Sequence, residues 1–135
     1  MQNQLLKVLA NKEYRLSTDK LHIELELLKI KDIKEQEILA FVHNSLSNSL
    51  PPVYNGYFET LASNHNRNTR NGKNLITIST HTTNIEGLSI KIQGAKLWNK
   101  TNKDLKQIPK VKNFKSKFKL NCLQFYKRNL TNSYN

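Results

Sequence analysis

The chain has 135 residues, of which 37% are hydrophobic, and 22 Lys and Arg against 10 Asp and Glu give it a net charge of +12. This length allows one small domain or a piece of a larger one, and the basic balance favours an anionic partner. A single cysteine, Cys122, excludes an internal disulfide framework, and no window approaches the roughly 18 apolar residues of a membrane span. We therefore expect an intracellular protein, cytoplasmic or nuclear, that is not secreted.

Helical signals dominate the first part of the chain. Leucines on one side predict a short helix over residues 1–10. Thr18 is a plausible N-cap for a second helix, in which Leu21, Leu25 and Leu28 form an apolar stripe at spacings of four and three. This stripe is a candidate packing face.

The clearest helix is predicted to begin at Asp32, because Glu35 follows three residues later in the arrangement of a capping box. Its apolar face consists of Ile38, Leu39, Val42 and Leu46. Pro51 and Pro52 are expected to end the run, since proline cannot continue a helix. The next segment has three aromatic residues, which are expected to seal a small core rather than stack on bases: Tyr54, Tyr57 and Phe58.

A polar, aperiodic stretch over residues 63–74 predicts a loop, and the alternation after it predicts a short strand over residues 75–80. The loop carries Arg67, Arg70 and Lys73, whose cationic groups suit phosphate contacts. These three are candidate nucleic-acid-binding residues. The alternative is a local role, in which Thr69 and Arg70 tie the loop to the domain by hydrogen bonds.

Residues 88–98 are expected to begin extended and to finish as a helix, and residues 101–109 are expected to form a connector. Trp98 is interpreted as a structural anchor, because its neighbours are apolar and a buried tryptophan dominates a small core. Base stacking on Trp98 is the alternative interpretation.

A final amphipathic helix is predicted from Val111 onward. Its apolar face holds two further anchors, Phe114 and Phe118, and its polar face has four candidate nucleic-acid-binding residues: Lys112, Lys115, Lys117 and Lys119. Residues 100–135 hold ten Lys or Arg residues and one acidic residue, Asp104, a net charge of +9. Such a segment attracts phosphate backbones. The alternatives are a solvated basic face without a partner and a helix that lies on a membrane surface.

These elements predict a fold that is mainly α with a minor short β element, a small helical accessory domain. We divide it into a helical part over residues 1–62, a polar loop and short strand over residues 63–87, and a basic C-terminal part over residues 88–135.

No complete catalytic or metal-binding pattern occurs in the sequence. Two-metal nucleotide chemistry needs clustered carboxylates, and the aspartates Asp19, Asp32 and Asp104 are scattered. One cysteine and four separated histidines do not provide zinc-ligand spacing. We therefore assign no catalytic residue, no metal ligand and no cofactor to this chain, and expect it to be inactive alone.

Several sequence blocks occur in a characteristic order: residues 28–33 (LKIKDI), 38–44 (ILAFVHN), 65–70 (HNRNTR) and 94–99 (GAKLWN), followed by a basic amphipathic helix. This order resembles the extreme C-terminal region, after the palm and thumb, of reverse transcriptases from LINE-type (non-LTR) retrotransposons, such as Jockey- and CR1-like elements. The resemblance covers nearly the whole chain. Ala95 departs from it, because the family more commonly has proline there.

The resemblance implies a fragment of an RNA-directed DNA polymerase. The family's palm, with the paired aspartates that hold Mg²⁺, would precede Met1, and no residue here corresponds to a catalytic position. The implied partners are RNA or an RNA–DNA hybrid, together with the polymerase core, and no membrane. Two hypotheses follow: a segment that holds the template–primer or the element RNA, or a structural packing segment or decayed remnant without independent activity.

Overall fold

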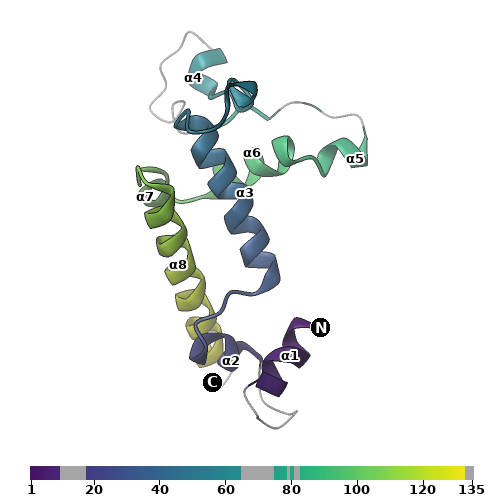
Figure 1. The fold of residues 1–135 in the computed structure, drawn as a ribbon, viewed down its shortest axis with the longest axis vertical. Helices are drawn as coiled ribbons and strands as arrows, with labels where there is room; N and C mark the ends of the chain where they lie inside the picture. Colours follow the sequence, from purple (N-terminus) through teal and green to yellow (C-terminus); the bar gives the residue numbers. More distant parts are fainter. Residues whose placement is uncertain (10–17, 65–74, 79, 81–82, 133–135) are drawn as a thin grey trace. The chain divides into compact units, whose positions relative to one another are not determined.

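A computed structural model describes residues 1–9, 18–64, 75–78, 80 and 83–132 (Figure 1). The predicted fold class is confirmed, because these residues are mainly helical and the β element is one antiparallel bridge between Thr60 and Ile76. The elements are α1 (Gln2–Leu9), α2 (Thr18–Glu24), α3 (Ile30–Leu46), the 3₁₀ turn η1 (Pro52–Tyr54), α4 (Leu61–Asn64), α5 (Asn84–Gly87), α6 (Ile90–Lys100), α7 (Lys103–Lys106) and α8 (Val111–Asn132).

The chain forms two compact units. The first consists of residues 1–34 and 116–135, and the second consists of residues 35–115. Helices α3 and α8 therefore have residues in both units. The predicted boundaries at residues 62 and 88 both fall inside the second unit.

The apolar stripe predicted for the second helix is wrong in part. Leu21 and Leu28 are buried, whereas 43% of the surface of Leu25 is exposed. The reason is the end of α2 at Glu24, where Glu26 adopts the left-handed φ of 49°. The N–H groups of Glu26 and Leu27 then donate to carbonyl oxygens of the last turn, at 3.2 and 2.9 Å, which is the hydrogen-bond pattern of a Schellman motif.

Helix α3 begins at Ile30, two residues before the predicted start, so Asp32 lies inside its first turn and the predicted capping box is wrong. The side chain of Gln2 holds this helix start from α1. Its Oε1 accepts from the N–H of Ile30 at 2.9 Å, and its Nε2 donates to the carbonyl of Leu28 at 3.1 Å. A side chain distant in sequence thus satisfies a backbone N–H that the helix leaves without a partner.

At its other end α3 stops before the prolines that were predicted to end it. Asn48 has a φ of 51°, and Ser49 donates its N–H to the carbonyl of Asn44 at 2.9 Å. Asparagine tolerates this left-handed conformation better than most residues. The turn at Asn48, rather than Pro51, therefore sets the helix end.

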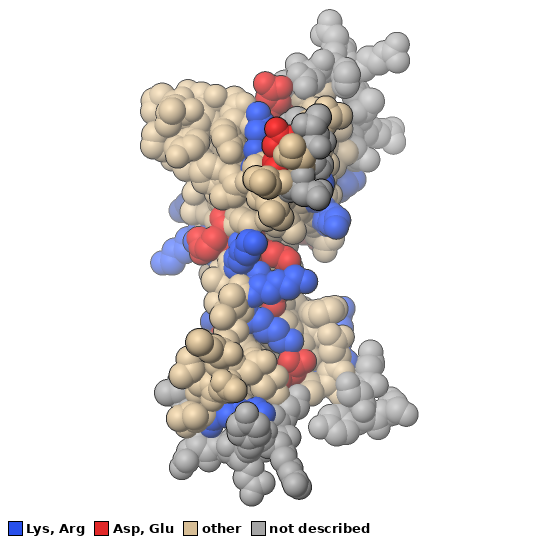
Figure 2. Space-filling view, turned by 90° about the vertical axis from the view of Figure 1, so that its right-hand side faces the viewer, with Lys and Arg blue, Asp and Glu red and all other residues tan. Residues whose placement is uncertain are grey.

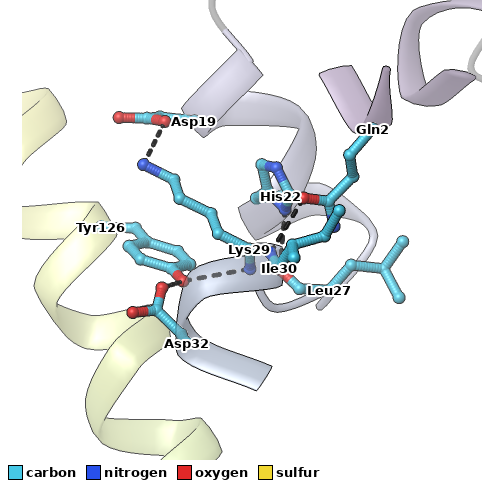
Figure 3. Close-up of polar contacts among 8 residues, drawn as sticks. All are labelled: Gln2, Asp19, His22, Leu27, Lys29, Ile30, Asp32 and Tyr126. Carbon is cyan, nitrogen blue, oxygen red and sulfur yellow. Dashed lines mark hydrogen bonds and ion pairs between the residues drawn. The ribbon is translucent and has the colours of Figure 1, made fainter. Parts of the chain in front are cut away.

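Tyr126 of α8 is the polar centre of the first unit (Figure 3). Its side chain is 3% exposed, and its hydroxyl donates to the Asp32 carboxylate and accepts from the N–H of Lys29 at 3.3 Å. The Lys29 ammonium lies 4.8 Å from the centre of the Tyr126 ring and 2.7 Å from the Asp19 carboxylate. Burial, followed by the hydrogen bond to Asp32, raises the pKa of Tyr126 well above its ordinary value of 10.0.

This raised pKa predicts alkaline instability of the first unit. The stability contributed by Tyr126 is complete below its ordinary pKa and is lost as the pH rises toward the folded-state value, because the unfolded chain ionises first. In an absorbance titration of tyrosinate, we expect a late ionisation of Tyr126 that coincides with loss of helicity. The Tyr126→Phe variant should lack this late step, and an unchanged titration in that variant would contradict the assignment.

Helix α6 starts in a helical conformation from Ile90, so the prediction that residues 88–98 begin extended is wrong. Ser89 is the reason, because its Oγ caps the helix by accepting from the N–H of Ile92 at 3.4 Å. The helix packs within the second unit, whose buried apolar residues include Val42, Phe58, Ile76, Ile92, Ala95, Trp98, Leu105 and Phe114.

Gly94 allows the close approach of α6 to its neighbours in this core. A Cβ atom at Gly94 would lie 2.9 Å from Cγ2 of Val42 and 3.0 Å from Cζ of Phe58. We expect Gly94→Val to destabilise the chain by about 2–3 kcal/mol through overpacking, measured by urea denaturation. The control is Lys96→Val, an exposed position on α6 with the same β-branched substituent, which should cost no more than about 0.7 kcal/mol. Equal losses of unfolding free energy in both variants would show that a side chain at position 94 does not overpack the core.

Candidate nucleic-acid interface

The predicted basic loop residues Arg67, Arg70 and Lys73 lie outside the described residues. The segments on either side of them are described, and they pair with each other. Leu61 donates its N–H to the carbonyl of Leu75, and Thr77 donates its N–H to the carbonyl of Glu59, both at 2.9 Å. The two ends of the predicted loop are therefore held together by backbone hydrogen bonds.

Asn99, at the end of the GAKLWN block, secures this pairing. Its Nδ2 donates to the carbonyl of Ile76 at 2.9 Å, and its Oδ1 accepts from the N–H of Ile76 at 2.8 Å. The side-chain amide thus pairs with the backbone as a neighbouring strand would. Sequence reasoning did not assign this role, although Asn99 stands in a quoted motif beside Trp98.

The four candidate lysines of α8 have different surroundings. Lys112 and Lys117 are exposed, and Lys115 and Lys119 are half-buried. Lys115 donates to both carboxylate oxygens of Glu37 at 2.7 Å, so its charge is already offset within the second unit. The geometry therefore makes Lys115 a weaker candidate for phosphate contact than the exposed lysines.

Helical spacing also separates these lysines. Lys112, Lys115 and Lys119 follow at intervals of three and four residues and share one side of α8, whereas Lys117 lies two residues from both Lys115 and Lys119 and points elsewhere. The sequence thus does not place all four lysines in one cluster. The difference matters because a phosphate backbone can engage only cations that face the same side.

Two exposed basic residues that sequence reasoning did not select lie further along α8, namely Lys127 and Arg128. Arg128 follows Lys117 by eleven residues, which is close to three full turns, so the two share one side of the helix. Lys127 lies next to Arg128, about 100° from it around the helix axis and about 80° from Lys117, so it borders this side. We call Lys117, Lys127 and Arg128 the basic stripe of α8. Figure 2 shows Lys and Arg side chains at the surface with acidic side chains among them.

Trp98 and Phe114 form the centre of the second unit. They are 4% and 0% exposed, and their ring centroids lie 6.3 Å apart in a stacked arrangement with an interplanar angle of 25°. The ring of His43 lies 5.3 Å from Phe114. Phe118, the third predicted anchor, is half-buried. With the Lys106 side chain beside the indole, this packing leaves little of the Trp98 surface open to an unpaired base.

The connector after α6 is tied to this aromatic centre. His43 is 6% exposed, and its Nε2 donates to the carbonyl of Ile108 at 2.6 Å. Leu105 of α7 is buried, and the ammonium of Lys106 lies 5.8 Å from the centroid of the Trp98 ring. The basic connector thus has a defined conformation beside Trp98.

Among the described residues, no group of three or more His, Cys, Asp or Glu side chains is arranged to hold a metal ion. None of the described helices combines the length and apolar content that a bilayer crossing requires. Comparison with known proteins adds no relative, because no protein-family model, no curated protein and no solved structure matches this chain.

Proposed function

We propose that this chain is a non-catalytic, intracellular segment that holds RNA or an RNA–DNA hybrid through backbone phosphates. In this proposal it corresponds to the C-terminal region of a LINE-type reverse transcriptase, and the polymerase core supplies the chemistry. The sequence blocks support the family assignment. The surface charge of the helix supports the binding role.

The observation that carries the proposal is the composition and exposure of α8. Its 22 residues contain six basic side chains and no acidic one: Lys112, Lys115, Lys117, Lys119, Lys127 and Arg128. The basic stripe is exposed along three turns of this helix. Cations presented in this way contact phosphates without reading base sequence, so little sequence preference is expected.

Removal of the basic stripe tests whether α8 makes these contacts. The triple variant Lys117→Gln, Lys127→Gln and Arg128→Gln should bind an RNA–DNA hybrid more weakly, and its slope of log affinity against log salt should flatten by about two to three. The matched control replaces three exposed lysines of the same unit by Gln: Lys20, Lys31 and Lys34. It removes the same charge and should flatten the slope by less than about one. Equal changes in both variants would show that total charge, and not α8, governs binding.

Exposed apolar side chains in the first unit favour a second candidate function, packing against another protein surface. Four of them are between 43% and 76% exposed: Leu5, Val8, Leu27 and Ile30. Leu5 and Val8 are three residues apart on α1 and share one side of it, and a contiguous exposed apolar patch marks an interaction surface. This candidate predicts concentration-dependent self-association of the isolated chain in sedimentation experiments, without a saturable nucleic-acid complex.

A further inference from the structure

A pocket of about 340 Å³ opens in the second unit between the end of α3, Trp98 and the connector after α7. Its lining combines an indole, an ammonium, a hydroxyl and an amide, from Trp98, Lys106, Ser47 and Gln107. Its volume lies within the range of small-molecule sites, where apolar walls are combined with a few polar groups. The pocket lies in a segment with five lysines and one acidic residue over residues 100–112.

Lys106 is the charged group of this pocket. Its ammonium lies over the Trp98 ring, 5.8 Å from the centroid, and no carboxylate in the described part of the chain forms an ion pair with it. Burial, followed by the charge of Lys103, lowers the pKa of Lys106. A partly desolvated cation that has an aromatic ring but no anion as its neighbour is a group that an incoming anion would stabilise.

The remaining polar groups of the pocket have capacity for a ligand. His43 lines it and is 6% exposed. Its Nε2 is bonded to the carbonyl of Ile108, and its Nδ1 is buried without a hydrogen-bond partner among the described residues. A ligand N–H would satisfy this nitrogen. The hydroxyl of Ser47 donates to the carbonyl of His43 at 2.8 Å and lies 3.2 Å from the Ser49 hydroxyl, which leaves one lone pair of its oxygen able to accept.

We infer that this pocket binds a single nucleotide unit, with the phosphate at the Lys106 ammonium and the base against Trp98 and His43. The inference rests on the proposed function, for which it names a subsite. On binding, the phosphate replaces the indole as the partner of Lys106, and the base occupies the space that the lysine side chain leaves beside the ring. A planar ring with an attached anion matches the lining better than either part alone, because the apolar and cationic groups are adjacent.

The single tryptophan of the chain makes this inference directly measurable, since all tryptophan fluorescence comes from Trp98. Titration of the full chain with AMP should change this fluorescence saturably. Adenosine and inorganic phosphate should each bind at least about tenfold more weakly, because each lacks one of the two contacts. The inference is overturned if AMP produces no saturable change, or if phosphate alone binds as tightly as AMP.

Two variants localise the site. Lys106→Met retains most of the side-chain length and removes the charge, and should weaken AMP binding by about tenfold or more. Lys96→Met removes an exposed charge from α6 and should leave AMP affinity within about twofold, because Lys96 does not line the pocket. Equal affinity of the wild type and Lys106→Met would overturn the inference. Binding of an RNA–DNA hybrid is measured in parallel. If the chain binds the hybrid but not AMP, the pocket inference alone is refuted. If it binds AMP but not the hybrid, the proposed function alone is refuted.

Discussion

The Phe114→Ala variant is expected to lose about 3–5 kcal/mol of unfolding free energy, the largest effect of any single substitution considered for this chain. Phe114 is 0% exposed and contacts both Trp98 and His43 through its ring. Truncation removes these contacts and leaves a cavity beneath the indole. Urea denaturation followed by the fluorescence of Trp98 measures the loss where it occurs, because the tryptophan is one of the two rings that stack.

Phe125 provides the control on the same helix. It is 61% exposed, so Phe125→Ala removes an identical side chain from α8 without opening a cavity. Its effect should lie within about 0.5 kcal/mol of zero. Similar losses for Phe114→Ala and Phe125→Ala would contradict the core that the structure describes.

Asn99→Ala is also expected to have a large effect, a loss of about 2–3 kcal/mol of unfolding free energy. The substitution leaves the N–H and the carbonyl of Ile76 without their partners, and Ile76 is only 2% exposed. Buried backbone groups without hydrogen bonds cost about 1–3 kcal/mol each. The loss of these hydrogen bonds should make the amide of Ile76 exchange faster with solvent, and it should lower the unfolding free energy measured by denaturation.

Asn102→Ala separates the role of Asn99 from a general effect of asparagine. Asn102 is exposed, and its side chain makes no capping hydrogen bond at the start of α7. Its replacement should change stability by less than about 0.5 kcal/mol. A neutral Asn99→Ala variant would mean that solvent replaces the amide at Ile76 and that the pairing at the base of the loop does not depend on it.

The existence of most helices could be predicted from the sequence, because apolar periodicity is a local property. The final helix from Val111 is an example, and the structure places its start at that residue. Helix ends were less predictable. Glu26 and Asn48 both adopt a left-handed φ, and a glutamate gives no sequence signal for that conformation.

Contacts between distant residues could not be predicted from local pattern. Gln2 holds the start of α3 from 28 residues away, and Lys115 pairs with Glu37 from 78 residues away. The latter pair changes the interpretation of a candidate binding residue, because it offsets the charge of Lys115. The roles of Gly94 and Asn99 likewise depend on neighbours that only the fold brings together.

The candidate nucleic-acid residues were predicted from charge alone, and charge does not specify which side of a helix a lysine faces. Counting turns along α8 separates Lys117 from the other three lysines and places Arg128 on its side. Lys106 was also not selected, because its significance lies in its position over Trp98.

The salt dependence of binding decides whether this chain holds nucleic acid through backbone phosphates. The full 135-residue chain is titrated onto an RNA–DNA hybrid at several salt concentrations, and log affinity is plotted against log salt. If about five phosphates are engaged, the slope should lie near −4 to −5. A slope near zero would contradict the proposal that this chain holds nucleic acid through its basic side chains.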